Sequence, residues 1–193
     1  MLIDFSPISY KQAEQNFDWY ELGLTTPEQF VRETEDEWPE KDVEVTEQQW
    51  LDFWYDTIDP RRATHGAAGY DLFAPYGFTL KPGEEITIPT GFRVIIQNCD
   101  VALFILPRSG AGFKYYARLA NTLGLIDKDY ARSSNEGHCF ARLRNESTDK
   151  EWVVKTGEAY AQGVFLPYYL TARDGMHEKQ LRDGGLGSTT KNA

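Results

Sequence analysis

The 193-residue sequence has only two cysteines, Cys99 and Cys139, which excludes a disulfide-stapled scaffold and suits a reducing compartment. Its three histidines are scattered and share no zinc-ligand spacing with these cysteines. No apolar run approaches the ~18 residues of a membrane span, and the first residues lack the basic and apolar regions of a signal peptide. We therefore expect a cytoplasmic protein, of a bacterium or of the host cell if the source is viral, without a membrane partner.

The net charge of −10 is concentrated in one segment. Residues 11–57 hold 14 Asp or Glu against three basic residues, a net charge of −11, and four of the five tryptophans. This charge excludes direct binding of nucleic acid by the segment, because the phosphate backbone attracts basic surfaces. An acidic face could instead bind a basic protein partner or simply keep the protein soluble.

Helix signals recur within residues 11–58. Thr26 precedes Pro27, as a capping hydroxyl precedes a proline at the first helical position. Thr46 precedes a second run, with Gln49 at the capping-box position. Trp50, Phe53 and Trp54 follow at the spacing of one helix face and should be buried. Because disordered segments are poor in aromatics, we favour a folded helical module over acidic disorder.

The chain divides by composition into four parts. Residues 1–10 contain a possible first strand of the core, which favours an insertion at 11–58 over an N-terminal extension. Residues 59–178 alternate short β-type runs with turn signals, at 77–80, 85–88, 92–96, 101–106, 139–143, 151–154 and 163–166. Residues 179–193 form a glycine-rich arm. The fold class expected is mainly β, an antiparallel sandwich with a small helical insertion.

Residues 121–130, NTLGLIDKDY, combine unlike chemical groups in a short space. Asn121 offers an amide that can both donate to and accept from a nucleobase edge. Asp127 offers a carboxylate that can take a proton from water, and Tyr130 offers a flat ring. A buried strand would not need this mixture.

This segment resembles the third signature motif of the trimeric dUTP pyrophosphatases (dUTPases). Four further segments resemble the other signatures in the family's order: AAGYDL at 67–72, PRSG at 107–110, GEAYAQ at 157–162 and RDGGLGSTT at 182–190. The resemblance runs from about residue 63 to the C-terminus. It implies a distorted jelly roll, a homotrimer whose three chains share each site, and hydrolysis of dUTP to dUMP and pyrophosphate.

The resemblance also assigns roles in the third motif. Asp127 would activate the water that attacks the α-phosphorus. Asn121 would read uracil together with Leu125 and Ile126, in a tight hairpin that turns at Gly124 and would leave no room for the methyl group of thymine. Tyr130 would pack beneath the sugar and exclude a 2′-hydroxyl.

In the remaining motifs, the resemblance assigns Arg108, Ser109, Gly110 and Gln162 to the phosphates. It places Asp71 near Mg²⁺ through water, and the ion itself would be carried mainly by the triphosphate. The C-terminal arm would close over bound nucleotide. Its contacts would come from Arg182, Leu186, Gly187 and Ser188. The tail is not a P-loop, because Gly-Lys-Ser/Thr is missing from it.

The sequence departs from the family at three points. Ala159 replaces an arginine, Leu186 replaces an aromatic that stacks on uracil, and Ala131-Arg132 stands where Arg-Gly is usual.

Two alternatives to the hydrolase remain. One is a dCTP deaminase, which shares the fold, and the other is a dUTPase-like scaffold whose acidic insertion binds a regulatory protein. Since no signature residue lies in 11–58, deleting that segment is expected to leave the site chemistry intact.

Overall fold

Short strands form most of the protein, in a computed structural model that describes residues 2–17 and 45–176. The strands are β1 (Leu2–Pro7), β2 (Tyr70–Phe73), β3 (Phe78–Leu80), β4 (Glu85–Pro89), β5 (Phe92–Gln97), β6 (Val101–Pro107), β7 (Arg118–Leu119), β8 (Gly124–Ile126), β9 (Phe140–Arg144), β10 (Trp152–Val154) and β11 (Ala159–Pro167). The helices are α1 (Tyr10–Asn16), α2 (Glu47–Phe53) and α3 (Ser109–Tyr115). Single turns follow α2 (η2, Trp54–Ile58), β8 (η3, Tyr130–Arg132) and β11 (η4, Asp174–Met176).

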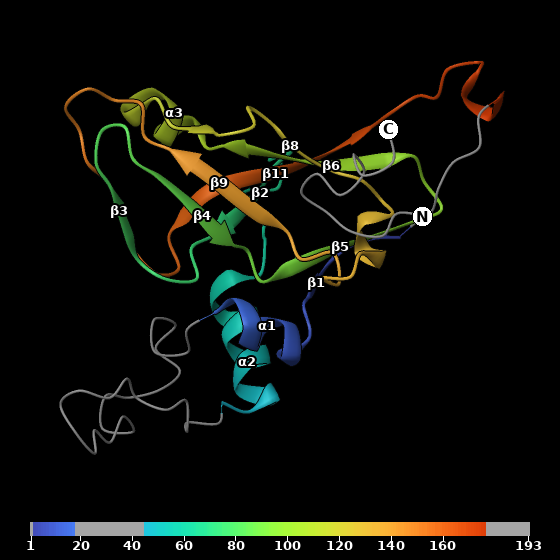
Figure 1. Cartoon of the computed structure of the whole chain (residues 1–193), viewed down its shortest axis with the longest axis horizontal. Coiled ribbons are helices and arrows are strands. Elements are labelled where there is room, and N and C mark those ends of the chain that lie inside the picture. The colour runs from blue at the N-terminus through green and yellow to red at the C-terminus, as the bar shows by residue number, and fades with distance from the viewer. Residues whose placement is uncertain (1, 18–44, 177–193) are drawn as a thin grey trace.

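The strands pair antiparallel in four small sheets. The largest has the order β2-β11-β6-β8, and a second has the order β4-β9-β7. Two further pairs, β1-β5 and β10-β3, complete the sandwich. This is the mainly β jelly roll that the sequence predicts (Figure 1).

Alternation along the strands explains why these residues form a sandwich. In β5, Phe92, Val94 and Ile96 are buried, whereas the residues between them are half-buried. Strands β9 and β3 show the same period of two, which places one side of each strand in a common apolar core. All seven strand runs predicted from the sequence are present. Helix α3 was not predicted, because a serine and two glycines open it.

The N-terminal segment is joined to this core by strand pairing. β1 pairs with β5 along its whole length, from Leu2 opposite Gln97 to Pro7 opposite Phe92. Helices α1 and α2 then lie side by side below the sheets, between β1 and β2 in chain order (Figure 1). The residue bounds proposed for the four parts of the chain stay predictions.

Helix α2 begins as the sequence predicts. Thr46 accepts from the Gln49 backbone N–H at 3.2 Å, and the Gln49 side chain accepts from the Thr46 N–H at 2.9 Å. The predicted burial of Trp50, Phe53 and Trp54 is confirmed, since their exposed fractions are 0%, 8% and 1%. The other predicted helix start, at Thr26, lies outside the described residues, as do Trp19 and Trp38.

Helix α2 and the turn η2 pack tightly on the turn between β4 and β5. Gly91 has φ +76°, and a Cβ there would lie 2.6 Å from Ile58 Cδ1 and 3.1 Å from Trp50 Cη2. Only glycine fits this conformation and this approach. The Trp50 indole N–H also donates to the Ile8 carbonyl at 3.1 Å, which ties α2 to the end of β1.

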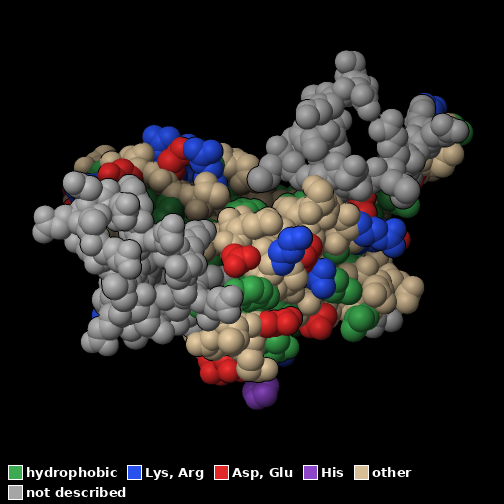
Figure 2. All heavy atoms as spheres, turned by 60° about the horizontal axis from the view of Figure 1, so that its bottom comes forward, with side chains coloured by type: hydrophobic (Ala, Val, Ile, Leu, Met, Phe, Trp, Pro, Cys, Tyr) green, Lys and Arg blue, Asp and Glu red, His purple; other side chains and the backbone are tan. Residues whose placement is uncertain are grey.

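Acidic and basic side chains of the described residues are interspersed on the face shown in Figure 2. Most of the acidic residues of the predicted insertion lie at positions 18–44, outside the described part of the chain. The binding of a basic partner by that segment therefore stays a prediction. None of the helices described is both long and apolar enough to cross a membrane.

Candidate functional site

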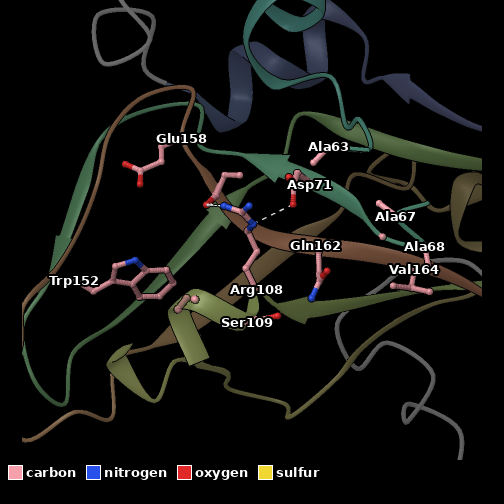
Figure 3. Close-up of a pocket in the computed structure, with 14 residues that line it drawn as sticks. Ala63, Ala67, Ala68, Asp71, Arg108, Ser109, Trp152, Glu158, Gln162 and Val164 are labelled. Atoms are coloured by element: carbon pink, nitrogen blue, oxygen red, sulfur yellow. Dashed lines mark hydrogen bonds and ion pairs between the residues drawn. The ribbon is translucent and has the colours of Figure 1, made fainter. Parts of the chain in front are cut away.

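An open pocket of about 590 Å³ lies where the second signature segment leaves β6 (Figure 3). The loop before β2, the start of α3, β10 and the start of β11 contribute to its wall. Its lining residues are Ala63, Ala67, Ala68, Gly69, Asp71, Arg108, Ser109, Gly110, Ala111, Trp152, Glu158, Ala159, Gln162 and Val164. The fold thus brings together residues from the first, second and fourth sequence motifs.

Arg108 is held in place by two neighbours. Its Nε–H donates to a carboxylate oxygen of Asp71 at 3.0 Å, and Nη1 donates to the Ala159 carbonyl at 3.1 Å (Figure 3). These bonds use two of the five guanidinium N–H donors. Among the described residues no other polar partner is recorded for Arg108, whose side chain is 41% exposed. Its remaining donors can therefore serve an anionic ligand.

Ser109 and Gly110 open helix α3. The first helical bond runs from the Gly112 N–H to the Arg108 carbonyl. The backbone N–H groups of Ser109 and Gly110 precede this bond and have no acceptor within the helix. Together with the serine hydroxyl, they add short-range donors beside the Arg108 guanidinium at the pocket wall.

Gln162 and Asp71 are cross-strand partners on β11 and β2. The Gln162 amide donates to the Pro107 carbonyl at 3.0 Å, so the side chain is fixed beside the second motif. Gly69 approaches it closely, because a Cβ there would lie 2.9 Å from Gln162 Oε1. The glycine of the first motif is therefore needed for close approach to the carboxamide.

The third motif lies elsewhere on the same sheet. β8 pairs with β6 through Ile126 opposite Leu103, Leu125 opposite Phe104 and Gly124 opposite Ile105. Continuing this register places Asp127 opposite Ala102, six residues before Arg108. At ~3.3 Å per residue, Asp127 and Arg108 are about 20 Å apart within one chain.

The hairpin around β8 differs from the prediction in one respect. Gly124 does not form the turn, because it lies within β8, whereas Thr122 has φ +68° and takes the left-handed position. Gly124 is required for another reason: a Cβ there would lie 3.0 Å from Ile105 Cβ and 3.3 Å from Leu119 Cδ2. The hairpin is thus tight through packing on β6. Asn121 precedes the turn and is exposed.

Tyr130 is a core residue of the chain, with an exposed fraction of 7%. Its hydroxyl donates to the His138 carbonyl at 3.1 Å and accepts from the Asn135 side-chain amide at 3.0 Å. The departure at Ala131-Arg132 is accommodated by η3, and Gly137 packs on it. The packing of Tyr130 beneath a sugar stays a prediction.

Asp127 is half-buried, and its carbonyl accepts from the Tyr130 N–H at 3.1 Å. The ammonium group of the neighbouring Lys128 donates a hydrogen bond to the Asp100 carboxylate at 2.8 Å. This hydrogen bond raises the pKa of Lys128. The predicted contacts of Arg182, Leu186, Gly187 and Ser188 lie outside the described residues.

Several pocket residues were not predicted from the sequence. Glu158 and Trp152 line the wall, and Trp152 stacks on Tyr115 of α3 with ring centroids 5.7 Å apart. Glu158 lies inside the fourth motif, which was a usable signal. Trp152 had no comparable signal, because it lies outside the sequence motifs, on β10, which pairs with β3.

The pocket offers two carboxylates: Asp71 is paired with Arg108, and Glu158 accepts from the Lys155 backbone N–H at 3.1 Å. Elsewhere in residues 2–17 and 45–176, no group of three His, Cys, Asp or Glu side chains is placed to hold a metal ion. Asp71 acting through water fits Mg²⁺ that is bound mainly by substrate phosphates. It does not fit a metal caged by protein ligands alone.

The fold is that of a β-sandwich protein, and its pocket carries guanidinium, hydroxyl and amide donors of the kind that suit an anionic ligand. The dUTPase family model matches residues 56–190, and the chain belongs to this family. The deoxyuridine 5'-triphosphate nucleotidohydrolase of Lactococcus lactis is 43% identical over 131 residues, covering 67% of this chain and 86% of that protein. Its counterpart in Desulfitobacterium hafniense is 38% identical, covering 67% and 85%.

Solved structures agree. The crystal structure of dUTPase from Streptococcus mutans has a TM-score of 0.52 and 36% identity, covering 59% of this chain and 88% of that one. The dUTPase from phage phi11 of S. aureus has a TM-score of 0.50 at 20% identity, which supports the fold alone. The predicted resemblance is thus confirmed. The dCTP deaminase alternative finds no support among these relatives.

Proposed function

We propose that this protein hydrolyses dUTP to dUMP and pyrophosphate, with Asp127 as the base. Asp127 takes a proton from a water molecule whose oxygen attacks the α-phosphorus. The bond from that phosphorus to the oxygen bridging the α- and β-phosphates breaks, and pyrophosphate leaves with the bridging oxygen. The observation that carries the proposal is the pocket of Asp71, Arg108, Ser109 and Gln162 in a chain of the dUTPase family.

The phosphates are assigned to the pocket. Arg108 directs its remaining N–H donors at them because Asp71 and the Ala159 carbonyl fix the guanidinium. Ser109 and Gly110 add a hydroxyl and backbone N–H groups, and Gln162 adds a carboxamide. Mg²⁺ bound to the phosphates would neutralise part of their charge, with Asp71 contributing through water.

The uracil ring of the substrate binds at the β8 hairpin. Asn121 donates to and accepts from the uracil edge, together with backbone groups of Gly124, Leu125 and Ile126. Cytosine presents the reversed pattern at its fourth position, which would leave buried groups unpaired. The close packing of Gly124 on Ile105 supports a hairpin too tight for the methyl group of thymine. Tyr130 packs beneath the sugar and excludes a 2′-hydroxyl.

The two halves of this site must come from different chains. Asp127 has to lie within a few ångströms of the α-phosphate, yet it is about 20 Å from Arg108 in its own chain. We therefore propose a homotrimer in which the β8 hairpin of one chain faces the phosphate pocket of another. The C-terminal arm, with Arg182, Leu186, Gly187 and Ser188, is proposed to close each site.

Pyrophosphate release from dUTP, dCTP, dTTP and UTP, measured in parallel with Mg²⁺, tests the assignment. We expect dUTP to be hydrolysed with a kcat/KM at least about 100-fold above the other three, because each competitor leaves buried groups unpaired or clashes. Equal rates on dUTP and dCTP, or ammonia release from dCTP, would contradict the proposal.

Gly69→Ala is expected to raise KM for dUTP about tenfold with little change in stability. The new Cβ would meet the flexible end of Gln162 and displace its carboxamide from the phosphates. Gly66→Ala is the matched control, since a Cβ there meets nothing within 4 Å. Equal KM values for both variants would show that Gln162 does not contact substrate.

A further inference from the structure

The position of Tyr130 depends on the turn that follows it. As described above, its hydroxyl is bonded to the His138 carbonyl and to the Asn135 amide. Gly137 has φ +75°, and a Cβ there would lie 2.5 Å from Ala131 Cα and 2.8 Å from the Tyr130 carbonyl oxygen. The turn at 135–138 therefore lies directly on η3 without space between them. Any shift of this turn must move Tyr130.

Helix α1 holds the same turn at two places. The Glu136 carboxylate accepts from the Ser9 N–H at 2.9 Å and from the Ser9 hydroxyl at 2.6 Å. The His138 ring lies 2.8 Å, through Nδ1, from the Asn16 side-chain oxygen. Ser9 caps the start of α1 and Asn16 is its last residue, so both ends of the helix contact the turn.

The direction of the His138 bond follows from its other partner. Nε2 accepts from the Gly91 N–H at 3.0 Å, so Nδ1 carries the proton and donates to Asn16. His138 has an exposed fraction of 0%, and burial lowers its pKa to about 4, against the opposing effect of Glu136. The neutral ring is thus fixed by one donor and one acceptor. Phe17 covers it, with ring centroids 6.0 Å apart.

We propose that α1 positions Tyr130, which follows the β8 hairpin. Asn16 acts as a positioning residue through His138, and Ser9 acts as one through Glu136. The inference rests on the proposed function, in which Tyr130 contacts the sugar. Removing the Asn16 amide would leave a buried N–H without an acceptor, and the turn would shift to satisfy it. This proposal predicts the opposite of the expectation that deleting residues 11–58 leaves the site chemistry intact, which stays a prediction.

The test compares Asn16→Ala with Gln15→Ala, its exposed neighbour on the same helix. For each variant, kcat/KM is measured for dUTP and for UTP. We expect Asn16→Ala to lower the dUTP-to-UTP ratio at least about fivefold, because a displaced Tyr130 no longer excludes the 2′-hydroxyl. Gln15→Ala should keep the wild-type ratio. Simple destabilisation would lower both rates in proportion and leave the ratio unchanged.

Asn16→Asp provides the rescue, since its carboxylate still accepts from His138, and it should restore the ratio. Glu136→Gln is the second variant should Asn16→Ala not fold. It weakens the contact with Ser9 and should lower the ratio in the same direction. A wild-type ratio in the folded Asn16→Ala or, failing that, in Glu136→Gln would overturn the positioning role. A wild-type protein inactive on dUTP would instead reject the proposed function itself, and with it this inference.

Discussion

Replacing Asp127 by asparagine is expected to lower kcat for dUTP at least about 100-fold, the low end of what a positioned base supplies. Asparagine keeps the shape of the side chain but cannot take a proton from water. Binding of a non-hydrolysable dUTP analogue should persist, because the groups proposed to hold its phosphates, those of Arg108, Ser109 and Gln162, are unchanged. Single-turnover kinetics and analogue titration would measure the two effects separately.

Asp129→Asn is the matched control. It removes a carboxylate two residues away, in the same turn, where the side chain is exposed. We expect this variant to keep kcat within about threefold of the wild type, as most surface substitutions do. A large loss in Asp129→Asn with normal turnover in Asp127→Asn would make Asp129 the general base and refute the assignment to Asp127.

The fold was largely predictable because its strands carry a local signal. A period of two, as in Phe92, Val94 and Ile96, together with turn residues at each end, fixes both the strand and its inward face. The Thr46 capping box was equally local, since both partners lie within three residues. Signals of this kind need no knowledge of distant contacts.

The site was only partly predictable, because its geometry depends on contacts between segments far apart in sequence. Arg108 and Asp71 were assigned separately to phosphate and metal, yet they form one ion pair across neighbouring parts of the fold. The sequence placed the hairpin turn at Gly124, but the need for glycine there comes from Ile105 on β6. Neither contact leaves a local pattern.

The insertion illustrates the same limit. Its aromatic helix face predicted burial correctly, but not which surface it would cover. His138, one of three scattered histidines in the sequence, proves to join α1 to the turn behind Tyr130. A histidine in this role requires one donor and one acceptor from two different segments, Gly91 and Asn16, and no spacing rule connects them.

Mixing two inactive variants should restore activity if the two halves of each site come from different chains. Arg108→Ala and Asp127→Asn trimers are each expected to lose about 100-fold in kcat, for want of a charged donor or of the base. After co-refolding in equal amounts, random assortment would give about one quarter of the sites an intact Arg108 and an intact Asp127. We therefore expect about a quarter of the wild-type activity.

The control mixes Asp127→Asn with the double variant carrying both changes, which cannot form an intact site in any arrangement and should stay inactive. Activity that remains at the single-variant level in the first mixture, with mixed trimers verified by mass, would place Arg108 and Asp127 in one chain. That outcome conflicts with the register of β6 and β8, which keeps them about 20 Å apart. A complemented mixture is therefore the result that the strand pairing requires.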